Sequence, residues 1–255
     1  MRFPLRLSAA LLRAKFSRRT SSNPIFRLCP QIARVGDTSP AEHLAPEIAW
    51  HSAEECVRLA QSQGSPIVWL GACEPMLQPE IGEVASLLLG AGHHVFVHTS
   101  GQGLRRRIHE FTPDSRLFLT FEFAGREIQH DCAKAQSRPF PQIMEAIRAA
   151  KLSGFLVCAH VTVGAEANVC EIGEFFEYLD GQDIDGFIVS SGGAVLNASE
   201  TNQVRDKLEE ILCLPRDPRW EKFSRLLEAS YATRPAISAP AKVRGSETNA
   251  YQEGV

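Results

Sequence analysis

Two apolar strands separated by a helix decide the fold of this chain. The first stretch reads Pro66-Ile-Val-Trp-Leu-Gly-Ala-Cys-Glu-Pro75, and the second reads Val95-Phe-Val-His-Thr-Ser-Gly101. Between them, Pro79 occupies a position suited to the first turn of a helix. The apolar face of that helix comprises Ile81, Val84, Ala85 and Leu88. A strand, a helix and a second strand predict a βαβ unit, in which the two strands are parallel.

The same alternation continues along most of the chain. A capping-box pattern at Ser52-Ala-Glu-Glu55 begins a helix that extends to Gln63. Further strands are predicted at 117–123, 155–163 and 186–189, and further helices at 105–107, 141–151 and 172–179. Strands that alternate with helices in this way predict an α/β fold, with a mostly parallel sheet and outer helices.

The pattern changes after residue 198. Two amphipathic helices are predicted, one around Val204 to Leu212 and one from Asp217. Residues 232–255 are rich in Ala, Pro, Ser and Gly, which predicts a disordered tail. We therefore divide the chain into a basic segment that includes a degenerate first strand (1–36), a barrel core (37–198), C-terminal helices (199–231) and the tail (232–255).

The N-terminal segment is basic and contains no acid before Asp37. Leucine and phenylalanine residues alternate with its arginines, and this mixture permits three interpretations. The segment is an amphipathic helix on an anionic membrane surface, an organellar transit peptide, or a helix docked on the protein. No apolar run is long enough to span a bilayer. We expect a cytoplasmic protein, with membrane association as the alternative.

The cysteines indicate a reducing compartment. The chain has seven, and no Cys-x-x-Cys motif occurs. An odd number of well-separated cysteines favours free thiols over a disulfide framework. The net charge of −3 gives no reason to expect a nucleic-acid partner.

The turn Ala72-Cys73-Glu74-Pro75 and the strand end Thr99-Ser100-Gly101 resemble the radical S-adenosylmethionine (SAM) superfamily. There the turn is usually Gly-Gly-Glu-Pro, and the strand ends in Thr-Asn-Gly. Within the superfamily, the chain is most similar to the hopanoid-biosynthesis enzymes that attach adenosyl to a polycyclic lipid. Other landmarks are Pro24-Ile-Phe-Arg27, Glu127-Ile-Gln-His-Asp131 and Gly186-Phe-Ile-Val-Ser190. The resemblance implies a partial (β/α)6 TIM-type barrel with its functional groups at the carboxyl ends of the strands.

The resemblance also implies SAM and a [4Fe–4S] cluster, but the cluster ligands are missing. In the family, three cysteines follow the Phe-Arg pair, and in register they correspond to Leu28, Ile32 and Val35. Aliphatic side chains have no donor atoms for iron. Cys29 lies one position away and has no partner in the sequence. We therefore expect no cofactor, and the chain resembles a degenerate member.

The residues of the implied SAM site are partly changed. Ala72 and Cys73 replace two glycines and would crowd the methionine moiety, whereas Glu74 retains the acid that would bind the SAM ammonium group. Glu122 would place a negative charge near the SAM carboxylate. The first strand, expected at Arg19–Asn23, is polar. The remaining residues that we assign to this degenerate site are Thr99, Ser100, His160 and Ser190.

Three other features carry alternatives. His98, His160 and Cys158, with Cys73, Glu74 and Glu122, would supply a mixed metal site, although a hydrogen-bonded core histidine is the commoner case. His93-His94 is expected at the surface. Arg105-Arg-Arg107 is expected on a solvated helix face.

The leading functional interpretation is a pseudoenzyme without radical chemistry. It would bind a hydrophobic, isoprenoid-type ligand or an authentic radical SAM enzyme, with a link to hopanoid or isoprenoid lipid metabolism. The alternative is an active radical SAM or metal-dependent enzyme with relocated ligands, for example Cys29, Cys73 and Cys158.

Overall fold

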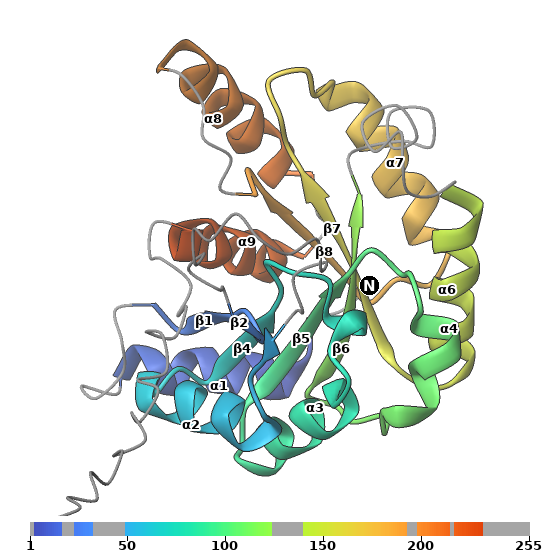
Figure 1. Ribbon diagram of the computed structural model, residues 1–255. Helices are drawn as coiled ribbons and strands as arrows, with labels where there is room; N and C mark the ends of the chain where they lie inside the picture. Colours follow the sequence, from blue (N-terminus) through green and yellow to red (C-terminus); the bar gives the residue numbers. More distant parts are fainter. Residues whose placement is uncertain are drawn as a thin grey trace, which may run out of the picture.

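The computed structural model describes residues 3–16, 23–32, 49–123, 140–192, 198–214 and 217–231. Six parallel strands form one sheet in the order β1-β4-β5-β6-β7-β8 (Figure 1). A separate antiparallel pair joins β2 to β3. The strands are β1 (Ile25–Leu28), β2 (Gln31–Ile32), β3 (Ala49–Trp50), β4 (Ile67–Leu70), β5 (His94–Thr99), β6 (Leu117–Phe123), β7 (Leu156–Thr162) and β8 (Gly186–Ser190). This parallel half-barrel confirms the predicted α/β class and partial TIM-type barrel.

Helices cover the outer face of the sheet. They are α2 (Ala53–Gln63), α3 (Ile81–Gly90), α4 (Leu104–Arg107), α6 (Phe140–Leu152), α7 (Val169–Asp180) and α8 (Ala198–Leu212). The predicted helix start at Ser52 is confirmed, because Ser52 Oγ accepts a hydrogen bond from the backbone N–H of Glu55 at 3.3 Å. Gly64, at φ 64°, ends the same helix in the left-handed conformation that glycine adopts without strain.

Side chains on the two faces of the sheet form two separate cores. In β4, Val68 and Leu70 belong to the outer core under the helices, whereas Ile67 and Trp69 belong to the inner core. Strands buried on both faces must be apolar throughout, which explains the continuous apolar runs in the sequence. The inner core comprises Phe3, Leu7, Ile25, Ile67, Trp69, Phe96, Phe118, Cys158, Ile188, Trp220, Phe223 and Leu227.

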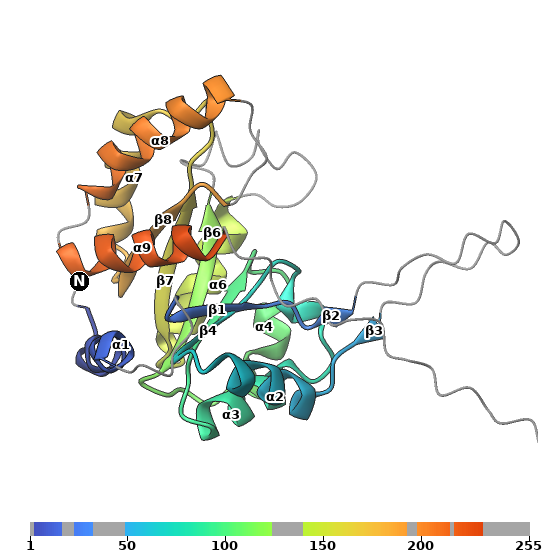
Figure 2. The ribbon, with the colours of Figure 1, turned by 90° about the vertical axis from the view of Figure 1, so that its left-hand side faces the viewer.

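Two terminal helices, α1 (Leu5–Phe16) and α9 (Pro218–Tyr231), contribute to the inner core. α9 contacts both edge strands, β8 and β1, and therefore covers the open side of the half-barrel (Figure 2). Trp220 lies over Gly186, where a Cβ atom would stand 2.2 Å from the indole ring. Helix α1 is attached through Phe3, whose backbone nitrogen donates to Asp217 Oδ2 at 3.1 Å.

The position of the first strand was wrong. The first strand of the sheet is β1, Ile25–Leu28. Its residues other than Arg27 are apolar and buried, and it pairs with β4 along its whole length. Burial of its apolar residues stabilises the strand at this position, and residues 19–22 of the polar stretch lie outside the described residues. β1 lies within segment 1–36, where the first strand was expected, and it pairs with β4, while α9 contacts β1 and β8. The predicted tail and Glu127–Asp131 lie outside the described residues.

One surface prediction was also wrong, and a second holds for two of its three residues. His93 and His94 are buried, at 7% and 5% exposure. They lie at the start of β5, close to helix α1 and to the residues that precede β4. Arg105 and Arg106 are exposed, as predicted. Arg107 is half-buried, and its guanidinium donates to the carbonyl oxygens of Met76, Gln78 and Pro79 at 2.6–2.8 Å. In the part of the chain that the structure describes, no helix is long and apolar enough to cross a membrane.

Candidate functional site at the barrel mouth

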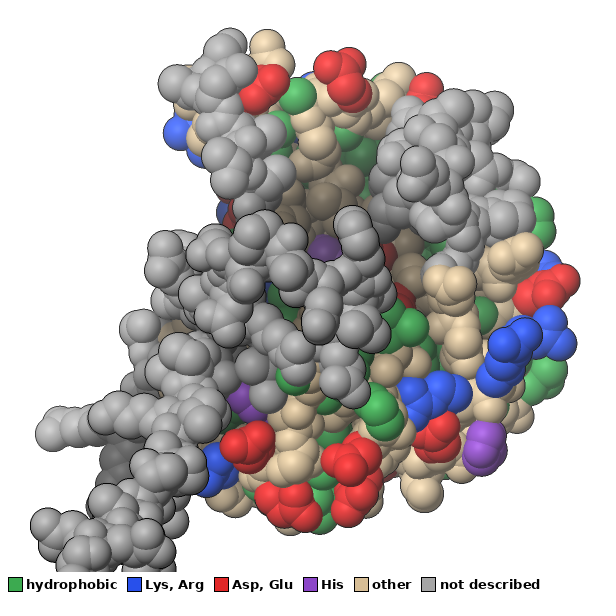
Figure 3. Space-filling view, viewed as in Figure 1, with side chains coloured by type: hydrophobic (Ala, Val, Ile, Leu, Met, Phe, Trp, Pro, Cys, Tyr) green, Lys and Arg blue, Asp and Glu red, His purple; other side chains and the backbone are tan. Residues whose placement is uncertain are grey.

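The carboxyl ends of the strands surround a cavity of about 350 Å³, which we call the mouth pocket. Figure 3, drawn in the orientation of Figure 1, shows a hollow near the centre of this face with a histidine visible inside it. The pocket is lined by Arg27, Trp69, Ala72, Cys73, Glu74, His98, Ser100, Glu122, His160, Thr162, Gly192 and Tyr231. It therefore unites six of the predicted site residues directly, and hydrogen bonds place Thr99 and Ser190 immediately behind its wall.

Glu74 is bound from several directions by its own chain. Its carboxylate accepts hydrogen bonds from Thr99 Oγ1 at 2.6 Å, from the Ser100 backbone at 2.9 Å and from the Met76 backbone at 3.2 Å. The Ser100 hydroxyl donates to it as well. A carboxylate offers about four acceptor sites, so these donors occupy its hydrogen-bonding capacity. Glu74 thus joins the ends of β4 and β5.

The turn before Glu74 retains the backbone shape that glycine would favour. Ala72 adopts φ 75°, a left-handed conformation that costs an L-residue about 1 kcal/mol. Gly71 has no room for a side chain, because a Cβ atom would lie 2.9 Å from Trp69 Nε1. Ala72 is exposed and Cys73 is half-buried, and both residues line the pocket.

Cys73 has a thiol partner, contrary to the sequence-based expectation for Cys29. The two sulfur atoms lie 3.3 Å apart, a hydrogen-bonding separation for thiols. Stabilisation by the Cys73 thiol lowers the pKa of Cys29 to about 6, and the nearby Arg27 guanidinium contributes in the same direction. The same interaction raises the pKa of Cys73. At neutral pH the pair therefore consists of one thiolate and one thiol.

This assignment predicts a shifted pH profile for the alkylation of Cys29. Because the thiolate is the nucleophile, the rate of its modification by iodoacetamide should have its midpoint near pH 6. Cys73→Ala removes the donor, and the midpoint should move up by about two pH units, towards that of an ordinary cysteine. Mass spectrometry of the modified peptide gives the rate. A midpoint that stays unchanged in Cys73→Ala would contradict the pairing.

Three further side chains form a hydrogen-bonded row across the mouth. His160 Nδ1 lies 2.9 Å from His98 Nε2, and His160 Nε2 lies 2.7 Å from Ser190 Oγ. Trp69 packs against both rings, with centroids 5.1 Å from His98 and 5.5 Å from His160. The row connects β5, β7 and β8 and can relay a proton between its ring nitrogens.

The rim of the pocket carries opposite charges. Arg27 lies over the ring of Tyr231, 3.9 Å from its centroid, and Glu122 accepts a hydrogen bond from Thr162 at 3.3 Å. Our sequence analysis did not assign Arg27, Trp69, Thr162 or Tyr231 to the site. Alternation along β1 and β7 would have placed Arg27 and Thr162 on the inner face. No sequence signal links Tyr231, the last residue of α9, to the pocket.

The donor set does not fit a [4Fe–4S] cluster held by three thiolates. Leu28, at the first family position, is fully buried in the outer core and faces away from the mouth. Cys158 lies in the inner core among aromatic side chains, where burial raises the pKa of its thiol. Among the residues with described positions, no three His, Cys, Asp or Glu side chains gather closely enough to hold a metal ion.

The parallel half-barrel, its outer helices and the pocket at the carboxyl strand ends form a partial TIM-type barrel, a fold that the chain shares with solved structures. The chain is similar to Streptococcus suis SuiB bound to the precursor peptide SuiA, with a TM-score of 0.55 and 10% identity. The match covers 81% of this chain and 50% of SuiB. SuiB bound to S-adenosylmethionine gives a TM-score of 0.53 at 10% identity, covering 81% and 48%. This chain spans about half the length of SuiB, and the likeness shows the fold alone. No family model and no curated protein matches the chain.

Proposed function

We propose that this protein is a radical-SAM-like barrel that binds a small ligand at its mouth without cluster chemistry. The observation that carries the proposal is the donor set of the mouth. The described residues there supply one thiol pair, Cys29 and Cys73, while Leu28 packs in the outer core. Iron–sulfur ligation needs converging thiolates, and the other two family positions are aliphatic in the sequence.

The state of Glu74 supports the same proposal. The carboxylate that the resemblance assigns to the SAM ammonium group is occupied by Thr99, Ser100 and Met76. SAM would have to displace hydrogen bonds that now stabilise the ends of two strands, and each displaced bond to a charged group costs about 1.5–3 kcal/mol. We therefore propose that Glu74 has a structural role.

The composition of the pocket wall defines the ligand that we propose. Trp69 provides an apolar surface, and Arg27, Glu122 and the His98–His160 pair provide polar groups on the remaining sides. A compound with an apolar body and a polar end matches this wall. We propose an isoprenoid-type alcohol, in keeping with the resemblance to hopanoid-biosynthesis enzymes. Binding of a radical SAM enzyme partner is the alternative to this ligand, and a cytoplasmic location is a further part of the proposal.

Anaerobic reconstitution tests the absence of the cluster. The purified chain, treated with iron and sulfide beside an authentic radical SAM enzyme as positive control, should remain colourless and bind no stoichiometric iron. Brown protein with cluster absorption, or release of deoxyadenosine from SAM under reducing conditions, would overturn the proposal in favour of an active enzyme with relocated ligands.

A fluorescence titration tests the ligand. Trp69 lines the pocket, so farnesol should quench tryptophan emission in the wild type and not in Trp69→Phe, while SAM should leave it unchanged. Equal quenching in both proteins would show binding elsewhere and would reject the mouth as the isoprenoid site.

A further inference from the structure

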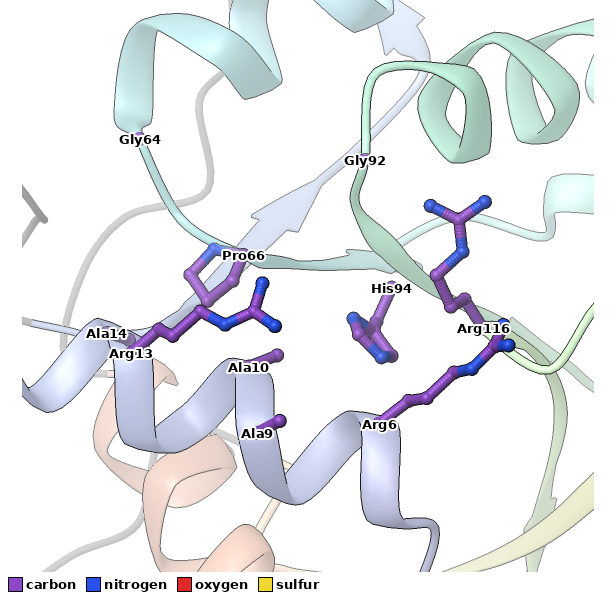
Figure 4. A pocket seen from close by; sticks show the side chains of 10 residues that line it. All are labelled: Arg6, Ala9, Ala10, Arg13, Ala14, Gly64, Pro66, Gly92, His94 and Arg116. Atoms are coloured by element: carbon purple, nitrogen blue, oxygen red, sulfur yellow. The ribbon is translucent and has the colours of Figure 1, made fainter.

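A second cavity, of about 540 Å³, lies at the opposite end of the barrel, where the strands begin. Pro66 precedes β4, His94 is the first residue of β5, and Arg116 precedes β6. Helix α1 closes the other side with the side chains of Arg6 and Arg13 (Figure 4). We call this cavity the basal pocket. It shares no lining residue with the mouth pocket.

The basal pocket is strongly basic. Its lining contains three guanidinium groups, those of Arg6, Arg13 and Arg116, and no carboxylate. Asp114 lies beside Arg116, with 3.3 Å between the carboxylate and Nε, and so offsets one of these charges. Arg6 donates to the Ser115 hydroxyl at 2.7 Å, a neutral partner. The lining thus carries an excess of positive charge, which a bound anion would compensate.

His94 stands inside this charged lining. Figure 4 shows its ring between the side chains of Arg6 and Arg13. The residue is only 5% exposed, and neither ring nitrogen has a hydrogen-bond partner among the described residues. A buried polar atom without a partner costs about 1–3 kcal/mol. Burial and then Arg116 lower the pKa of His94 to about 4, so at neutral pH the ring is uncharged and retains one N–H donor.

We propose that the basal pocket binds a phosphate-bearing ligand. Its oxygen atoms would accept hydrogen bonds from Arg6, Arg13 and Arg116, and the N–H of His94 would gain the acceptor that it lacks. The small side chains of α1, Ala9, Ala10 and Ala14, leave room for more than one phosphate. A soluble diphosphate and a phospholipid headgroup share this chemistry. The same helix exposes Leu5, Leu12 and Phe16, apolar side chains that can insert into a membrane surface. A lipid headgroup is therefore a source of the phosphate to be tested.

Calorimetric titration with inorganic diphosphate tests the soluble source. The wild type should bind, with an affinity that falls as salt concentration rises. Arg13→Ala and His94→Gln should each weaken binding about tenfold, as expected for loss of a hydrogen bond to a charged group. Lys15→Ala is the matched control, because Lys15 is exposed on the same helix and does not line the pocket. Circular dichroism verifies that each variant is folded.

Flotation with vesicles of phosphatidylcholine, with and without phosphatidic acid, tests the lipid source. Flotation that requires phosphatidic acid and is lost in Arg13→Ala but not in Lys15→Ala would assign the phosphate to a headgroup. Two results would overturn the proposal: no binding of either probe, or equal weakening by Arg13→Ala and Lys15→Ala. Neither result depends on the mouth pocket, so this inference stands or falls independently of the proposed function.

Discussion

Gly186→Ala should lower the free energy of unfolding by about 3 kcal/mol, the upper end of the usual cost of overpacking a core. The added Cβ atom would lie 2.2 Å from Trp220 Cζ2 and 2.5 Å from two other ring atoms. The indole cannot move aside easily, because it is fully buried and packs edge-on against Phe3 at 4.7 Å and Phe223 at 5.7 Å. Chemical denaturation followed by circular dichroism measures the change.

Gly90→Ala provides the matched control for this substitution. Gly90 is the last residue of α3, and a Cβ atom there would meet no other atom within 4 Å. Alanine in that position should stabilise the protein by about 0.5–1 kcal/mol, because it restricts the unfolded chain. A destabilisation of similar size in both variants would show that Gly186 is required for some reason other than the approach of Trp220.

Trp220→Ala should lower the free energy of unfolding by about 3–5 kcal/mol, as for other large buried aromatic side chains. Trp220 packs against β8 through Gly186 and against the start of the chain through Phe3, so its loss leaves a cavity that three elements border. The same denaturation experiment measures this loss. We also expect faster proteolysis of α1, which loses one of its contacts to the inner core.

The double variant separates the local contact from a general loss of stability. In the Trp220→Ala background, the ring that a Cβ atom at residue 186 would clash with is absent. Gly186→Ala should therefore lower the free energy of unfolding by at least 1 kcal/mol less than it does in the wild type. Leu5→Ala, at an 80% exposed position of α1, should change stability by less than about 0.5 kcal/mol. Strict additivity of the two core substitutions would contradict the packing of Trp220 on Gly186.

Much of the fold could be predicted because its signals are local. The capping box at Ser52, the apolar run of β4 and the strand at Leu117–Phe123 all depend on neighbouring residues, and each was placed within a residue or two. The first strand was misplaced because its predicted position was taken from the resemblance to a family. Burial of Ile25, Phe26 and Leu28 decided its true position.

The candidate site could be predicted only in part. Glu74, Thr99 and Ser100 were assigned to one site through the resemblance to a family. The structure brings them together because parallel strands have their carboxyl ends at one edge of the sheet. The hydrogen bonds among them were not predicted, and these bonds support the structural role that we propose for Glu74. The pairing of Cys29 with Cys73 joins residues 44 positions apart, and no sequence pattern reports such a contact.

By itself, the sequence determined the class of fold and the aliphatic character of Leu28, Ile32 and Val35, because periodicity and residue type are properties of the chain. Only the tertiary structure decided which groups share a pocket. It brought Tyr231 to the mouth, buried His94 beneath α1 and placed Trp220 on Gly186. The physical reason is that these contacts arise where terminal helices cover an open half-barrel, and their energies depend on distance in space rather than on separation along the chain.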